Sequence, residues 1–258
     1  LNTHLSLLNY QRLLEEKVQA EIALRHEQEQ LLVQNSKMAE MGDMINNIAH
    51  QWRQPVNRVS LLMSNIKMLI NDEQIDKDYI NQKISAALNQ LDFISETIDD
   101  FSNFFHPRKN KTDFYVLSAI NKTLKIIIGT FQSFGIEINV KGDDFSTFGI
   151  ENELAQVILI LLSNAKDAMV LQKVEDPQIT IKLNSKDKSI EFLDNGGGIN
   201  TSIINQIFDH YFTTKLKNEG SGIGLYTAKV IMQKTFNGEI FANNKGKGAS
   251  FKLIFNAD

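Results

Sequence analysis

A seven-residue repeat of apolar side chains in the N-terminal part of the chain constrains the fold more than any other pattern. It runs through residues 10–55, and a repeat of this length predicts a long helix that pairs with a second copy in a coiled coil and continues into a helical bundle. Polar Glu27 and Gln34 at d positions weaken the upper part of the seam, which fits a register device, a signalling hinge or a marginal linker helix. The a positions are Tyr10, Lys17, Leu24, Leu31, Met38, Ile45 and Trp52, and the d positions are Leu13, Ala20, Glu27, Gln34, Met41, Ile48 and Pro55.

A second helical pattern follows a polar turn at residues 71–74. Two helices joined by a short turn form a hairpin, and two hairpins form a four-helix bundle. Pro107 ends the second helix because it biases His106 away from helical angles, and the basic run 108–111 is predicted to be a linker. The apolar residues of this helix are spaced three and four apart: Ile80, Ile84, Ala87, Leu91, Ile94, Ile98, Phe101 and Phe105.

Beyond Asp113 the pattern changes to short β-rich segments that alternate with helices, which predicts an α/β sandwich. The fold class is therefore α+β, with a coiled-coil linker at 1–36, a dimerisation hairpin at 37–110 and a sandwich domain at 111–258. The predicted strands are 114–117, 136–140, 179–183, 190–193, 238–242 and 250–255, and the predicted helices are 118–131, 151–170 and 223–235.

Length, charge and composition narrow the class of protein. The 258 residues favour two units, and a net charge of −4 gives no support for nucleic-acid binding. The absence of cysteine excludes disulfides and thiolate metal sites. We expect a soluble, cytoplasmic fragment, because no apolar run approaches the roughly 18 residues of a membrane span and no signal peptide is visible. Since the first residue is Leu1, we expect a piece of a longer protein, whose membrane attachment stays open.

Two glycine clusters, at residues 194–199 and 220–225, indicate a nucleotide site. Asp194 ends an apolar strand, where its carboxylate can accept a hydrogen bond from the exocyclic amine of adenine. Gly196 and Gly198 let the backbone pass close to the base. Alone, this Asp-Asn-Gly run is more often a plain turn.

The second cluster opens a helix, so Gly222 and Gly224 can present backbone N–H groups to phosphate. Its G-x-G-x-G pattern differs from the Rossmann fingerprint, and no strand directly precedes it. Between the clusters, the aromatic residues of 207–215 are interpreted as a latch for a mobile lid and Lys215 as a phosphate contact. Phe208 and Phe212 taken singly fit an ordinary core equally well.

On the predicted helix 151–170, Asn164 and Asp167 are three residues apart and share a face. The Asn164 carbonyl oxygen suits Mg²⁺, a hard cation that is shared with substrate phosphates. A lone helical asparagine is usually solvated, so this interpretation depends on the glycine clusters.

Together these segments resemble the conserved boxes of sensor histidine kinases, within the superfamily of gyrase, Hsp90, MutL and histidine kinase ATP-binding domains. Asn164, the two glycine clusters and Phe208 to Lys215 match the ATP-binding boxes, and His50-Gln51-Trp52-Arg53-Gln54-Pro55 resembles the phosphoacceptor box. The resemblance covers residues 37–258 and implies ATP and Mg²⁺ as cofactors. The nucleotide-binding residues it implies are Asn164, Lys166, Asp167, Asp194, Gly196, Gly198, Ile199, Phe212, Thr214, Lys215, Gly220, Gly222, Ile223, Gly224 and Leu225.

The resemblance implies that His50 accepts the γ-phosphoryl group and passes it to an aspartate on the receiver domain of a response regulator, within a homodimer. Independently, the heptad places His50 at position f, on the outer surface of the bundle. His4, His26, His106 and His210 lack such a context.

Three residues depart from the common pattern of the family. Gln51 replaces the acidic residue that takes a proton from the imidazole; its amide cannot act as a base, but its carbonyl can accept the Nδ1–H and hold the tautomer that exposes Nε2. Gln54, four residues after His50, can orient a water for dephosphorylation of the regulator. Ile160 replaces either a second asparagine or the glutamate that activates water in the ATPase branches. The alternatives are a gyrase- or Hsp90-type ATPase, which Ile160 opposes, and a kinase-deficient scaffold or phosphatase module.

Overall fold

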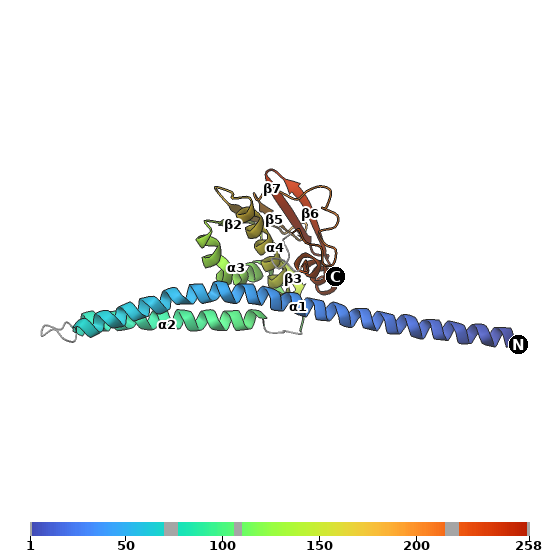
Figure 1. Ribbon diagram of the computed structural model, residues 1–258, viewed down its shortest axis with the longest axis horizontal. Coiled ribbons are helices and arrows are strands. Elements are labelled where there is room, and N and C mark those ends of the chain that lie inside the picture. The colour runs from blue at the N-terminus through green and yellow to red at the C-terminus, as the bar shows by residue number, and fades with distance from the viewer. Residues whose placement is uncertain (1, 70–76, 106–109, 215–221, 257–258) are drawn as a thin grey trace.

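Two long helices form the N-terminal part of the chain. The computed structural model describes residues 2–69, 77–105, 110–214 and 222–256. Helix α1 (Asn2–Leu69) runs without a break through Pro55, and α2 (Lys77–Phe105) lies along its second half (Figure 1). Ile66 of α1 and Ala87 of α2 are buried. The prediction of a long helix and a helical hairpin is confirmed.

The C-terminal part is built on a five-stranded sheet in the order β2-β4-β5-β7-β6. Strand β2 pairs in parallel with β4, and the other neighbours are antiparallel. A separate antiparallel pair joins β1 to β3, and β3 was not predicted from the sequence. The strands are β1 (Thr112–Tyr115), β2 (Glu137–Gly142), β3 (Ser146–Gly149), β4 (Gln178–Asn184), β5 (Ser189–Asp194), β6 (Glu239–Lys245) and β7 (Gly248–Ile254).

Three helices cover the sheet on the side that faces the hairpin: α3 (Val116–Ser133), α4 (Glu151–Leu171) and α5 (Gly224–Thr235) (Figure 1). Alternate strand residues such as Ile179, Ile181 and Ile190 are fully buried in the core with α4. By length and composition alone α4 is apolar enough to cross a membrane, and its buried place in this core accounts for that composition. The predicted α/β sandwich is confirmed.

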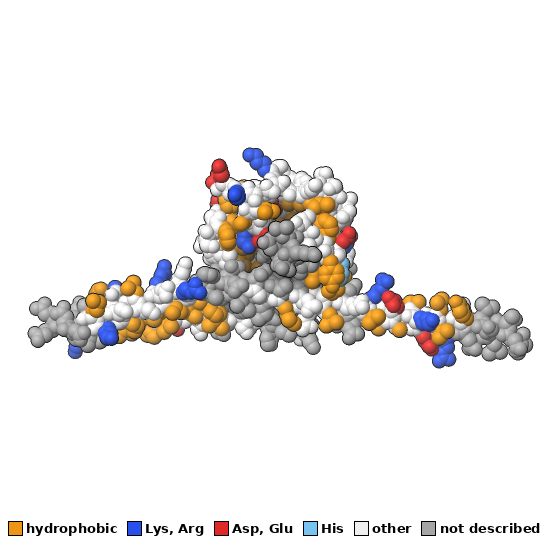
Figure 2. Space-filling model, viewed as in Figure 1, with side chains coloured by type: hydrophobic (Ala, Val, Ile, Leu, Met, Phe, Trp, Pro, Cys, Tyr) orange, Lys and Arg blue, Asp and Glu red, His pale blue; other side chains and the backbone are white. Residues whose placement is uncertain are grey.

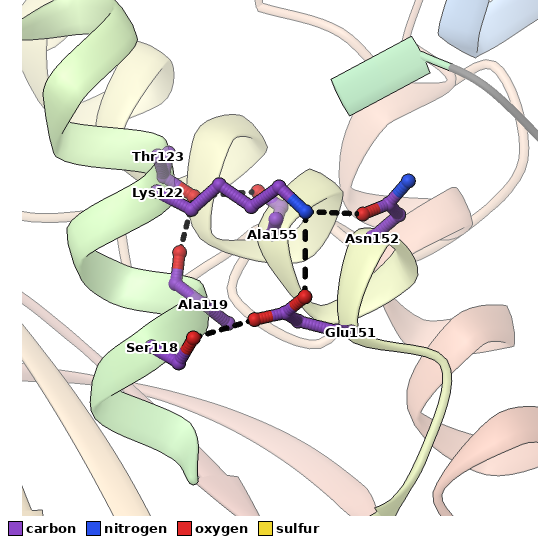
Figure 3. Close-up of polar contacts among 7 residues, drawn as sticks. All are labelled: Ser118, Ala119, Lys122, Thr123, Glu151, Asn152 and Ala155. Atoms are coloured by element: carbon purple, nitrogen blue, oxygen red, sulfur yellow. Dashed lines mark hydrogen bonds and ion pairs between the residues drawn. The ribbon is translucent and has the colours of Figure 1, made fainter. Parts of the chain in front are cut away.

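A polar network fixes the start of α4 against α3 (Figure 3). Lys122 Nζ donates to Asn152 Oδ1 at 2.8 Å and to Glu151 Oε2 at 3.3 Å, and Ser118 Oγ donates to Glu151 Oε1 at 2.7 Å. Glu151 lies in the first turn of α4, where a negative charge interacts favourably with the helix dipole. The network therefore holds the helix whose later turns carry Asn164.

Candidate functional site

Helix α4 lies against both glycine-rich segments of the chain. Ile160, Asn164 and Ala168 are four residues apart and share one face of the helix. A Cβ on Gly224 would lie 3.4 Å from Ile160 Cγ2, and one on Gly196 would lie 3.1 Å from Ala168 Cβ. Asn164, which is half-buried, therefore lies between the two glycine segments, which are about 12 Å apart along the helix.

Asp194 ends β5 and turns its carboxylate into the first glycine segment. Its Oδ1 accepts the backbone N–H of Gly196 at 2.8 Å and that of Ala249 at 3.1 Å. Both of these hydrogen bonds end on Oδ1, so Oδ2 can accept a hydrogen bond from an external amine. Burial raises the pKa of Asp194, while the bonds from Gly196 and Ala249 oppose that rise.

The first glycine segment follows a path that side chains would obstruct. Gly197 and Gly198 have φ angles of +90° and +78°, a region that favours glycine. Gly196 is buried, and a Cβ there would lie 3.2 Å from Asp194 Oδ1. The segment can thus bring its backbone close to a planar ligand, and half-buried Ile199 ends it.

The N-terminus of α5 forms the other end of the site. The N-cap residue Ile223 has no polar atom in its side chain, and the N–H groups of the first turn, which includes Gly224 and Leu225, suit phosphate oxygens. Gly222 has φ +65°, and a Cβ there would lie 2.6 Å from the Tyr211 backbone. Gly222 therefore packs directly on the backbone of the aromatic residues that precede it.

Two predicted site residues next to Asn164 pair with each other. Lys166 Nζ lies 2.7 Å from Asp167 Oδ1, and it also lies over the Phe134 ring at 5.5 Å from the ring centroid. Asp167 is one helical turn from Asn164. The ion pair holds both side chains at the edge of the site.

The aromatic residues before the second glycine segment pack on the core. Phe208 meets Phe251 edge to face at 6.4 Å, and Phe212 is partly buried against the same core. Thr214 is exposed at the end of this segment. Lys215 and Gly220 lie outside the described residues.

The helix that carries His50 contacts the C-terminal domain. Trp52 packs against its hydrophobic core, and α1 meets both α3 and α5. The heptad pattern predicted Trp52 in a seam between helices, whereas here its ring faces the sandwich. Gln54 is exposed on α1, while the side chains of His50 and Gln51 lie outside the described part.

No group of three or more His, Asp or Glu side chains that could hold a metal occurs among the described residues. Mg²⁺ needs few protein ligands, because it keeps several waters and shares phosphate oxygens. A single amide oxygen such as that of Asn164 therefore fits a magnesium ion that arrives with a nucleotide.

Asn244 on β6 belongs to the site, and the sequence patterns did not identify this residue. Its side chain bonds both the N–H and the C=O of Ile199, which is 45 positions earlier in the chain. The local signal is weak, since an asparagine near a Gly-Lys-Gly turn fits any hairpin end.

Comparisons with known proteins agree with this geometry. Residues 149–258 match the family described as histidine kinase-, DNA gyrase B- and HSP90-like ATPase. The two-component sensor PprA of Pseudomonas aeruginosa is 27% identical and covers 86% of this chain and 25% of its own length. The histidine-protein kinase AtoS of Escherichia coli is 27% identical, and the match covers 91% of this chain and 38% of the length of AtoS. The chain thus spans between a quarter and two fifths of the length of these relatives.

The chain was also compared with solved structures. The mycobacterial sensor histidine kinase MprB is 18% identical, with a TM-score of 0.49 over 57% of this chain and 97% of its own. Residues 149–258, which carry Asn164 and the two glycine segments, therefore match the histidine kinase-, DNA gyrase B- and HSP90-like ATPase family, and the chain is similar to proteins named two-component sensor and histidine-protein kinase.

Proposed function

We propose that this chain transfers the γ-phosphoryl group of Mg-ATP to His50 and then to an aspartate on the receiver domain of a response regulator. The observation that carries the proposal is the place of Asn164 between the two glycine segments, on a domain that contacts the helix of His50. Relatives named two-component sensor and histidine-protein kinase support it. The reaction takes place in the cytoplasm, where ATP is available.

The chemistry needs a reachable imidazole with a free nitrogen. Nε2 of His50 attacks the γ-phosphorus, the bond from that phosphorus to the ADP oxygen breaks, and the Nδ1 proton leaves to solvent. Gln51 accepts the Nδ1–H and thereby keeps Nε2 unprotonated before attack. Bound Mg²⁺ neutralises charge on the phosphates. Ile160 offers no group to activate water, which favours transfer over hydrolysis.

The two ends of the nucleotide have separate partners in this proposal. Oδ2 of Asp194 accepts a hydrogen bond from the adenine amine, while a guanine would set its carbonyl oxygen against the carboxylate. The N-terminus of α5 holds phosphate. Ile199 and Phe212 contribute apolar surface beside the base, and Thr214 contacts the phosphates. Lys215, the other predicted phosphate contact, lies outside the described residues.

The exposed apolar stripe on the hairpin fits a second copy of the chain. On α2, Ile84, Leu88, Leu91 and Ile98 follow helical spacing and are all exposed, as is Leu61 on α1. Figure 2 shows apolar side chains along much of the hairpin. Two helices cannot enclose such a stripe, whereas two hairpins form a four-helix bundle. We therefore propose that the chain forms a homodimer.

Leu88→Glu should dissociate this dimer, because it places a charge in the buried seam. Sedimentation equilibrium should give about twice 29.3 kDa for the wild type and about 29.3 kDa for the variant at micromolar concentration. Asn89→Glu, at the neighbouring exposed position, is the matched control and should stay dimeric. A monomeric wild type would contradict the proposal.

His50→Gln should abolish labelling of the chain by γ-labelled ATP with Mg²⁺, because no acceptor nitrogen remains. The wild type should carry label that is lost in acid and kept in base. His26→Gln, on the same helix, is the matched control and should label normally. Undiminished label in His50→Gln would refute the assignment.

The labelled chain should also transfer its phosphoryl group to a cognate receiver domain. Gln54 is exposed one turn beyond His50, where its amide can orient water against the phosphorylated aspartate. Loss of label from the receiver should accordingly be slower with Gln54→Ala. Equal loss rates would remove Gln54 from this role.

Asn164→Ala should weaken Mg-ATP binding by roughly 10- to 100-fold, because it removes an oxygen ligand from a charged centre. Asn164→Asp keeps an oxygen at this position and should retain most of the affinity. Titration of Mg²⁺ at fixed nucleotide measures the effect, with Ser163→Ala as the neighbouring control. Equal magnesium dependence in Asn164→Ala and wild type would exclude Asn164 as a ligand.

Asp194→Asn should weaken ATP binding without lowering stability. Asn keeps the oxygen that accepts the Gly196 and Ala249 bonds but removes the buried charge. The raised pKa of Asp194 means that folding takes up a proton, so its contribution to stability falls as pH rises from the ordinary value of 3.8 through the raised one. Urea unfolding across this pH range should show the fall in wild type and its absence in Asp194→Asn. Strong destabilisation of Asp194→Asn at neutral pH would contradict this account.

A further inference from the structure

The hairpin formed by β6 and β7 is bound to the first glycine segment at three points. Asn244 holds Ile199, the Gly197 N–H donates to Lys247 O at 2.9 Å, and the Ala249 N–H donates to Asp194 Oδ1. The turn between the two strands, at residues 246–247, lies directly over this segment. The hairpin is therefore a wall of the proposed nucleotide site.

Asn244 makes the most specific of these contacts. Its Oδ1 accepts the Ile199 N–H at 2.7 Å, and its Nδ2 donates to the Ile199 C=O at 2.6 Å. One side-chain amide thus satisfies both backbone groups of one residue, as a neighbouring strand would. No other side chain of similar length carries a donor and an acceptor in this arrangement.

The contact leaves little room for the glycine segment to move. A Cβ on Gly198 would lie 2.8 Å from Asn244 Oδ1, and one on Gly248 would lie 1.8 Å from the Asp194 carbonyl oxygen. Both glycines are thus required by close packing between hairpin and segment. The position of the Asp194 carboxylate is set by the same contact surface.

The fold does not need the Asn244 side chain. Strand β6 is at the edge of the sheet, and Asn244 is exposed. Its backbone pairs with Ala249 whatever the side chain, so the sheet register is independent of the amide. The two hydrogen bonds therefore serve the glycine segment.

We propose that Asn244 is a positioning residue for the nucleotide, which holds residues 194–199 in the conformation that selects adenine. A segment fixed before binding loses less conformational entropy when the ligand arrives. Without the amide, the segment must become ordered when the nucleotide binds, and this loss of conformational entropy weakens binding. The Asp194 carboxylate is then also less sharply directed at the adenine amine. Asn244 thus influences both affinity and base preference.

Binding of ATP and GTP to the full chain, measured by calorimetry, tests this inference, which rests on the proposed function. Asn244→Ala should bind ATP about tenfold more weakly than wild type, with a smaller preference for ATP over GTP. Its thermal midpoint should stay within about 3 °C of wild type. Asn243→Ala is the matched control: the same residue type, next on the same strand and exposed, which should bind as wild type does.

Asn244→Asp provides a second variant if Asn244→Ala fails to fold. It keeps the acceptor for the Ile199 N–H but sets a carboxylate oxygen against the Ile199 C=O, so it too should bind ATP more weakly. Wild-type affinity and base preference in either folded variant overturn the inference, as does an equal loss in Asn243→Ala. If the wild type binds no ATP, the proposed function fails instead.

Discussion

Burial of α4 against the sheet is the constraint on which the rest of the site depends. The helix is apolar over most of its surface because it packs between strands and neighbouring helices. The face with Ile160, Asn164 and Ala168 meets the two glycine segments, whose missing side chains allow that approach. A polar residue in the middle of this face is therefore next to any ligand that those segments bind. The hydrogen bonds from Lys122 to Glu151 and Asn152 hold the start of the helix in place.

Much of the fold could be predicted from periodicity. Long apolar repeats indicated both N-terminal helices, and alternating patterns indicated the five strands of the main sheet, because each pattern matches one buried face. The site was predicted where chemistry is local, as at Asp194, which follows a strand and precedes a turn. Asn244 could not be found in this way, since its function depends on a contact with Ile199 across the sheet. The domain limits at 36 and 110 stay a prediction.

The Asp194 carboxylate illustrates the conflict between stability and function in this site. Burial makes its charged form costly, and a neutral amide would satisfy the same two backbone donors. A fold selected for stability alone has no reason to keep a carboxylate there. In the proposed site, an amine donor on the ligand offsets this cost, because it supplies a hydrogen bond that no described residue gives to Oδ2. The electrostatic penalty would then become selectivity for a base with an amine at that position.

Trp52 shows how one helix can serve two surfaces. The heptad pattern assigns it to the same seam as Leu31, but its side chain packs on the core of the ATP-binding domain. The buried indole Nε1 has no hydrogen-bond partner among the described residues, which makes this contact less stable than a fully satisfied one. In the proposed reaction, a contact of this kind, two residues from His50, suits a domain that approaches the imidazole and then releases it.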